Sequence, residues 1–136
     1  EPKLGHITTF GGHPVNCVAS LACLEHLLST NIMQEAEEKE QLFRLHLQHP
    51  KIKKIRGKGL MLAVELEDKD LTKKVVEKSL EQGLILFYFL FTKTAFRITP
   101  PLTISNTEII VGCKIIKEIL DDKKRTTNSG PFHNVI

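Results

Sequence analysis

Apolar side chains in the first part of the chain repeat with the period of a helix. Residues 15–28 have apolar positions three or four apart and predict a helix, whose start is marked by two glycines and Pro14. Residues 29–31 end it. A second helix is predicted over residues 32–47. It ends before Pro50, because the residue before a proline disfavours a helical backbone. Its inner positions are expected to include Met33, Ala36, Leu42, Phe43 and Leu47.

The middle of the chain changes to the pattern of strands followed by a third helix. Residues 52–55 carry isoleucines at two positions and lead through a glycine-containing tight link, residues 56–59, into an apolar strand at residues 60–66. A polar turn at residues 68–70 can cap the next helix, and Gly83 stands where a helix C-cap is wanted. The inner face of that helix is predicted to carry Leu71, Val75, Val76, Ser79 and Leu80.

Two short strands and a last helix complete the predicted elements. The strands are residues 84–86 and residues 95–99, separated by an aromatic-rich connection at residues 87–91, and two prolines stop the second strand. Ser105 and Glu108 have the spacing of a capping box at the start of the last helix. That helix is expected to bury Ile109, Ile110, Cys113, Ile116, Ile119 and Leu120.

This order of elements predicts an α+β fold. Strands joined by a short glycine link pair antiparallel, so residues 31–122 are expected to form a small antiparallel sheet with helices on one face. The helix within residues 15–30 precedes that domain. Residues 1–14 are expected to form an arm or loop that needs another surface to pack on, and the polar residues 123–136 a disordered tail.

Composition narrows the class of protein. The chain has 136 residues, of which 41% are hydrophobic and 26% charged, as in an ordinary soluble globular protein. Its 19 basic and 16 acidic side chains leave a net charge of +3, which is too balanced to indicate nucleic acid binding. The densest basic run, residues 51–58, is interrupted by isoleucines and glycine and therefore predicts a strand with one solvated face.

Neither a membrane nor a metal is indicated by the sequence. No apolar run approaches the roughly 18 residues of a membrane span. The first residues show no hydrophobic segment after a basic start, so no signal peptide is indicated and a cytoplasmic location is expected. Cys17, Cys23 and Cys113 are odd in number and lack metal or redox spacing, which predicts buried free thiols.

Four stretches, in the same order and spacing, resemble the class III aminotransferases, of which acetylornithine and ornithine aminotransferases are the best-known members. Residues 5–14 (GHITTFGGHP) resemble the family's histidine, two small hydroxyl residues, aromatic residue and paired glycines before a long helix. Residues 55–61 (IRGKGLM), 82–85 (QGLI) and 97–105 (RITPPLTIS) resemble its strand pair, helix end and the segment before its last helix. His13 departs from the asparagine that is usual there.

The resemblance implies the C-terminal small domain of a fold-type I enzyme, with residues 15–30 as an interdomain helix and residues 1–14 on the side of a large domain. It implies a homodimer that uses pyridoxal 5'-phosphate (PLP) to move an amino group between an amino acid and a 2-oxo acid, with 2-oxoglutarate and glutamate as one pair. The family's Schiff-base lysine lies upstream, in a glycine-rich segment before the Thr-Phe-Gly-Gly motif. Lys58 is therefore expected to be a solvated turn residue, and this chain to be inactive and to bind PLP weakly without the large domain.

Thr8 and Thr9 are the candidate cofactor-binding residues. A phosphate needs hydroxyl and backbone N–H donors, and the adjacent Gly11 and Gly12 let the backbone approach closely. The residues alone are equally consistent with a pair of turn caps. The resemblance implies that Thr9 binds the cofactor phosphate of the neighbouring subunit and that Thr8 supports it.

Arg97 is the candidate substrate-binding residue. It lies in an otherwise apolar strand, where a guanidinium needs an acidic partner. That partner is either a substrate carboxylate or a carboxylate elsewhere in the fold. The resemblance implies that Arg97 holds the α-carboxylate of the amino donor or of 2-oxoglutarate. The aromatic run at residues 87–91 is expected to fill core and interface, and a minor role in substrate selection stays open.

Two hypotheses of different classes fit these residues. In the first, the chain is the C-terminal part of a PLP-dependent aminotransferase. In the second, it is a stand-alone interaction or structural domain derived from that fold, without catalysis. The first hypothesis also predicts an exposed apolar surface where the missing large domain would dock.

Overall fold

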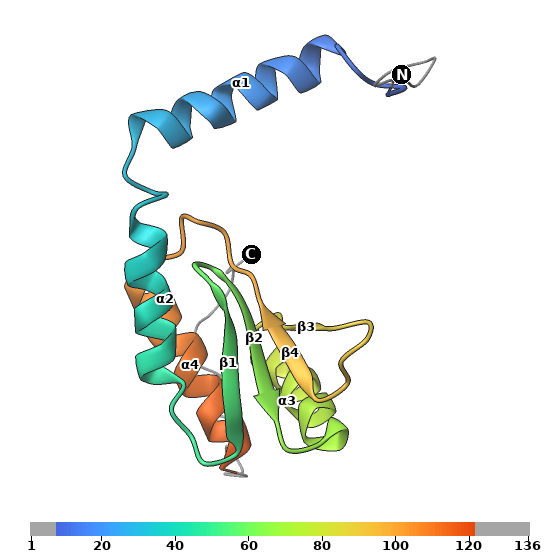
Figure 1. Ribbon diagram of the computed structural model, residues 1–136, viewed down its shortest axis with the longest axis vertical. Helices are drawn as coiled ribbons and strands as arrows, with labels where there is room; N and C mark the ends of the chain where they lie inside the picture. The colour runs from blue at the N-terminus through green and yellow to red at the C-terminus, as the bar shows by residue number, and fades with distance from the viewer. Residues whose placement is uncertain (1–7, 122–136) are drawn as a thin grey trace. The chain divides into compact units, whose positions relative to one another are not determined.

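The chain forms two compact units. The computed structural model describes residues 8–121, and the units divide the chain into residues 1–33 and residues 34–136. Figure 1 labels the helices and strands of both units. The predicted tail at residues 123–136 and His6 of the opening arm lie outside the described residues.

The first unit contains one helix, α1 (Pro14–Ser29), which starts at the proline as predicted. The Thr30 hydroxyl donates to the His26 carbonyl at 2.8 Å where the helix ends. None of the helix residues is buried, because no other described element of this unit packs on α1. Cys17 and Cys23 are exposed, so the prediction that they are buried is wrong. The large apolar side chains that α1 leaves exposed are Val15, Val18, Leu21, Leu24 and Leu28.

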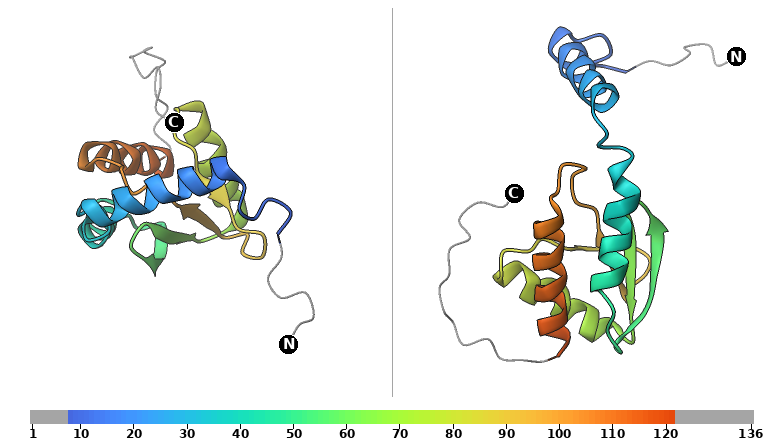
Figure 2. Two further views of the ribbon diagram at one scale, coloured as in Figure 1. Left: turned by 90° about the horizontal axis from the view of Figure 1, so that it is seen from above. Right: turned by 90° about the vertical axis from the view of Figure 1, so that its left-hand side faces the viewer.

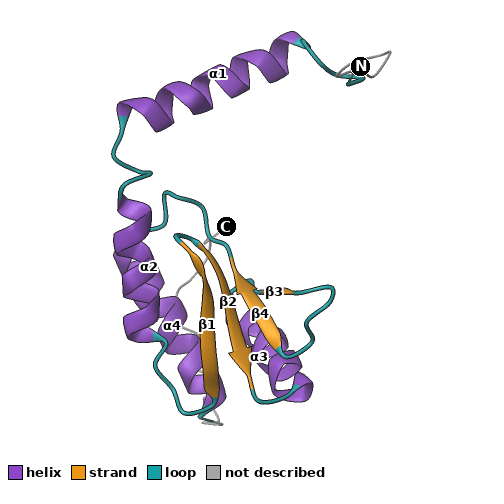
Figure 3. Cartoon of the chain, viewed as in Figure 1, coloured by secondary structure: helices purple, strands orange, loops and turns teal. Residues whose placement is uncertain are grey.

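The second unit is an α+β layer, as predicted. Its sheet has four antiparallel strands in the order β1-β2-β4-β3. Three helices pack against one face of the sheet, and Figures 2 and 3 show them on the same side of the strands. The elements are α2 (Glu35–His46), β1 (Ile52–Lys58), β2 (Met61–Leu66), α3 (Lys69–Glu81), β3 (Phe87–Tyr88), β4 (Ala95–Ile98) and α4 (Asn106–Leu120).

The core lies between the sheet and the helices. Alternate residues of β2 and β4 point into it, and Val64 and Phe96, which pair across the two strands, are fully buried. Residues Val75 and Ile109 close it from α3 and α4. Cys113 is also buried, as predicted, and burial raises the pKa of its thiol to about 12. It is therefore a protonated, apolar core side chain at neutral pH.

The helix ends follow the predicted local chemistry. The Asp68 carboxylate accepts hydrogen bonds from the backbone N–H groups of Asp70 and Leu71 at the start of α3. Ser105 and Glu108 form both halves of the capping box that opens α4. Gly83 follows α3 with a φ of 79°, a left-handed conformation that favours glycine.

Several predicted positions are wrong for identifiable reasons. Residues 84–86 are not a strand, since pairing with β4 begins only at Phe87, and the residues expected to form a connection after them begin the strand instead. The second helix starts at Glu35, and the link predicted at residues 56–59 is mostly strand, since β1 continues to Lys58. Three residues expected on inner helix faces are exposed, namely Met33, Leu80 and Ile110.

Arg44 closes the open edge of the sheet at β1. In the β1–β2 ladder, Ile55 and Gly57 lie two apart on the side that a further strand would use. The Arg44 guanidinium, from α2, donates to their two carbonyls at 2.8 and 3.1 Å. Its Nε donates to the Glu40 carboxylate at 2.8 Å, and that carboxylate also accepts the backbone N–H of Gly59. The pair of side chains therefore fixes the hairpin on α2 and blocks an edge that is otherwise free to pair.

Gly57 and Gly83 both have a positive φ, but only Gly57 lacks space for a Cβ, so the two glycines separate the cost of backbone strain from the cost of a steric clash. Gly57 has a φ of 123°, and a Cβ there would collide with the backbone carbonyl of Met61, whereas a Cβ on Gly83 would meet open space. We expect Gly57→Ala to lower the free energy of unfolding by about 3 kcal/mol and Gly83→Ala by about 1 kcal/mol. Urea denaturation measures both, and equal losses would contradict the role of the Met61 contact.

Because of Glu40, the free energy of unfolding is expected to depend on pH under acidic conditions. Burial alone would raise the pKa of this carboxyl, but the hydrogen bonds from Arg44 and Gly59, with the charges of Arg44 and Lys58, hold it below its usual value. A lowered folded-state pKa stabilises the protein above the unfolded pKa, and this contribution is lost as the pH falls below about 4. We expect the free energy of unfolding of Glu40→Gln to fall less steeply than that of the unmodified chain as the pH is lowered below about 4. An unchanged slope in the variant would contradict this.

Candidate functional site

The face of the sheet opposite the helices carries the polar and charged side chains. Residues that alternate away from the core share this open face, and they form a row from strand to strand. In order across the sheet, the row runs from β1 through β2 and β4 to β3. Its members are Arg56, Ala63, Arg97 and Phe87.

Arg97 lies at the centre of this row, on β4. Its neighbour on β2 is Ala63, whose methyl group leaves room beside the arginine. Its neighbour on β3 is Phe87, and the Arg97 Cζ lies 5.0 Å from the centroid of that ring. The guanidinium is half-buried and lies over an aromatic face, where its positive charge is attracted to the ring.

No described residue satisfies the Arg97 guanidinium with a carboxylate. Its Nε is buried and has no hydrogen-bond partner within residues 8–121. The carboxylate available on this face, that of Glu65, forms an ion pair with Arg56. A buried cationic donor without an acceptor is unfavourable unless an anion completes it. The alternative of a structural ion pair for Arg97 is therefore absent from the described part of the chain.

Thr8 and Thr9 lie in an exposed turn before α1. The Gly11 N–H donates to the Thr8 carbonyl at 3.2 Å, which closes the turn. A Cβ on Gly11 would come within 2.5 Å of the Thr8 hydroxyl oxygen, so glycine leaves that hydroxyl accessible. Gly12 has a φ of 74° and precedes His13, the N-cap of α1, which makes no side-chain cap. Exposed hydroxyl groups at a helix start are suited to an anion such as phosphate.

The predicted site residues fall into different units. Thr8 and Thr9 belong to the first unit and Arg97 to the second, so neither unit by itself contains all three. Lys58 lies at the exposed end of β1, beside the turn at Gly59, as a solvated residue. Among the described residues, no group of three or more His, Cys, Asp or Glu side chains is placed to hold a metal ion.

Phe87 is a contact of Arg97 that the sequence did not single out. The aromatic run was expected to fill core and interface, and Phe87 lies outside the core, 47% exposed on the edge strand. Only the antiparallel register, which pairs Phe87 with Arg97 ten positions later, brings the two together. A hairpin with a defined register would have been needed to predict this contact.

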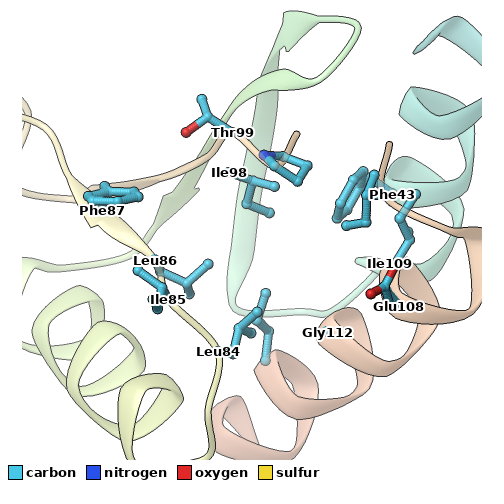
Figure 4. A pocket seen from close by; sticks show the side chains of 13 residues that line it. Phe43, Leu84, Ile85, Leu86, Phe87, Ile98, Thr99, Glu108, Ile109 and Gly112 are labelled. Carbon is cyan, nitrogen blue, oxygen red and sulfur yellow. The ribbon is translucent and has the colours of Figure 1, made fainter. Parts of the chain in front are cut away.

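A small apolar pocket lies on the other side of this strand. Figure 4 shows it between the segment that ends at Phe87, β4, and helices α2 and α4. Its volume is about 90 Å³. The carboxylate that lines it, Glu108, is engaged in the capping box of α4. Thr99 supplies the other polar side chain of a lining that is mostly apolar, so the open face with Arg97 is the better candidate site.

An antiparallel α+β domain with an uncompensated arginine on its open face fits a domain that helps to bind a carboxylate. The chain belongs to the aminotransferase class-III family, whose family model matches residues 2–120. It is 32% identical over 122 residues to the acetylornithine aminotransferase of Caldanaerobacter subterraneus and 35% identical over 130 residues to the 4-aminobutyrate aminotransferase of Escherichia coli. Both alignments cover 86% of this chain and 30% of the relative, so the chain spans less than a third of their length.

Solved structures agree with this family. The omega transaminase from Pseudomonas jessenii in complex with PMP matches with a TM-score of 0.76 at 28% identity, over 88% of this chain and 29% of that chain. The adenosylmethionine-8-amino-7-oxononanoate aminotransferase from Methanocaldococcus jannaschii matches with a TM-score of 0.73 at 27% identity, over 89% and 30%. Within the described residues, no helix is both long and apolar enough to span a bilayer.

Proposed function

We propose that this chain is the C-terminal part of a cytoplasmic, PLP-dependent aminotransferase that moves an amino group between an amino acid and a 2-oxo acid. One of the two proposed couples is 2-oxoglutarate and glutamate: 2-oxoglutarate accepts the amino group of another amino acid and becomes glutamate. The observation that carries the proposal is Arg97, whose Nε is buried on the open face without an acceptor. A substrate α-carboxylate would supply the missing anion through two parallel hydrogen bonds.

The cofactor would be held in part by the first unit. When bound, PLP supplies the electron sink that amino-group transfer requires. The exposed hydroxyls of Thr8 and Thr9, beside a turn that only Gly11 leaves open, fit its phosphate as donors. We propose that Thr9 binds the phosphate of the neighbouring subunit in a homodimer and that Thr8 supports it. In this reading residues 15–30 join the large domain to the small α+β domain.

The chain alone is proposed to be inactive. It spans 30% of the length of its aminotransferase relatives, and the family's Schiff-base lysine is expected upstream of residues 8–12. We expect the purified chain, mixed with PLP, glutamate and 2-oxo acids, to show no transamination above background. Its absorption spectrum before and after borohydride, with mass spectrometry, should give no covalent adduct. A stoichiometric adduct on one lysine would contradict this, and Lys58 would be the first residue to examine.

The alternative, a stand-alone interaction domain, is also compatible with the exposed face of α1. This helix has no buried residue and exposes five large apolar side chains along its length. Such a surface fits either the missing large domain or an unrelated partner. Restored transaminase activity, when the chain replaces the corresponding segment of a relative, would exclude the alternative. That replacement is the basis of the first experiment in the Discussion.

A further inference from the structure

The ring of Phe87 bears on the orientation of Arg97. The two residues are directly opposite in the β3–β4 ladder, so their side chains leave the sheet on the same face. The Arg97 Cζ lies 5.0 Å from the ring centroid. This is within the distance at which a guanidinium is attracted to an aromatic face.

The contact leaves the hydrogen-bonding capacity of the arginine free. A guanidinium is planar, and its five N–H donors point outward in that plane. An aromatic ring that occupies the planar face holds the group in place without accepting any of these hydrogen bonds. A carboxylate neighbour, such as the one that Glu65 provides for Arg56, would instead fill the donors that a substrate needs.

The rest of the row does not restrain Arg97 in the same way. Ala63, on the other side of β4, has only a methyl group, and the Arg97 Nε has no partner among the described residues. We propose that Phe87 is a positioning residue, which holds the Arg97 guanidinium with its donors presented to a substrate carboxylate. This inference rests on the proposed function of Arg97 and adds a residue that orients its guanidinium.

Nuclear magnetic resonance of the whole 136-residue chain can test the contact directly. The side-chain Nε–Hε signal of Arg97 is assigned by its loss in Arg97→Lys. A ring over the guanidinium shifts that proton upfield. We expect Phe87→Leu to abolish the shift and the conservative Phe87→Tyr to retain it. Tyr88→Leu is the matched control, since Tyr88 is equally exposed on the same strand but lies opposite Phe96.

Titration with glutarate then tests the role in binding. We expect glutarate to shift the Arg97 signal and to leave that of Arg56, which is paired with Glu65, in place. Phe87→Leu should weaken glutarate binding about threefold to tenfold. Phe87→Tyr and Tyr88→Leu should bind glutarate as the unmodified chain does. Urea denaturation of each variant verifies that the fold is intact.

The possible outcomes separate this inference from the proposed function. If Phe87→Leu changes neither the Arg97 proton shift nor the glutarate affinity, the positioning role of Phe87 is wrong and the function of Arg97 stands. If the shift is lost but the affinity is unchanged, the ring contacts Arg97 without positioning it, and the inference is again overturned. If glutarate does not shift the Arg97 signal in the unmodified chain, the proposal that Arg97 binds a carboxylate is wrong, and the inference about Phe87 is overturned as well.

Discussion

Arg97→Gln is expected to lower kcat/KM for transamination about a hundredfold in a complete enzyme that contains this segment. The enzyme would be the Escherichia coli 4-aminobutyrate aminotransferase with its aligned segment, 35% identical over 130 residues, replaced by this chain. Glutamine is close in size but has no charge, so it removes the ionic hydrogen bonds to the substrate carboxylate. Steady-state kinetics with 4-aminobutyrate as amino donor and 2-oxoglutarate as acceptor measure the effect, and the visible absorption of bound PLP verifies that the hybrid is assembled.

Arg56→Gln is the matched control for this experiment. Arg56 lies in the same row of the open face, two strands away from Arg97, but it is ion-paired with Glu65 and 49% exposed at its side chain. Exposed ion pairs contribute little, so its removal should change kcat/KM by less than about twofold. Arg97→Lys keeps the charge but loses the planar pair of donors, so its kcat/KM should lie between those of Arg97→Gln and Arg56→Gln. Equal losses at Arg97 and Arg56 would mean that Arg97 does not bind the substrate.

Those parts of the fold that depend on local chemistry could be predicted from the sequence. The start of α1 at Pro14, the Asp68 cap, the Gly83 helix end and the Ser105–Glu108 box all occur where predicted. Each depends on residues within about four positions of one another, so the local sequence is sufficient to predict the interaction. The antiparallel α+β class followed from the glycine link between two strands.

The errors occur where partners are distant in the sequence. Residues 84–86 have the apolar pattern of a strand, but whether they pair depends on the register with β4, which lies further along the chain, and that pairing begins at Phe87. Leu80 and Ile110 have apolar neighbours on their own helices, and their exposure is decided by where the other helices lie. An exposed apolar surface was predicted without a place in the sequence, and the described residues of the first unit leave five large apolar side chains of α1 exposed.

The candidate site was predicted as single residues and not as an arrangement. Arg97 stood out because a charged residue in an apolar strand needs an explanation. No carboxylate lies beside it because Glu65 forms its ion pair with Arg56. That pairing depends on the strand order, which places β2 between β1 and β4. The contact with Phe87 depends on register in the same way. The sequence thus identified the residue, and the fold shows that no carboxylate of the described residues pairs with it.

Phe96→Ala is expected to lower the free energy of unfolding of the second unit by about 3–5 kcal/mol. Phe96 has no exposed surface, pairs with Val64 on β2 and lies within the cluster shared by the sheet and the helices. Alanine would leave a cavity that the paired strands cannot close without breaking their register. Domains of this size are typically stable by about 5–15 kcal/mol, so the variant would lose a large part of its stability.

Phe91→Ala supplies the control with the same chemical change. Phe91 lies in the β3–β4 connection, five positions before Phe96, and is 97% exposed. Removing an exposed ring should change the free energy of unfolding by less than about 0.5 kcal/mol. Urea titrations of both variants, with equal m-values, measure the difference. Because the core on which Phe96 packs also fixes β4 against β2, a small loss at Phe96 would mean that Arg97 is not held by a rigid strand.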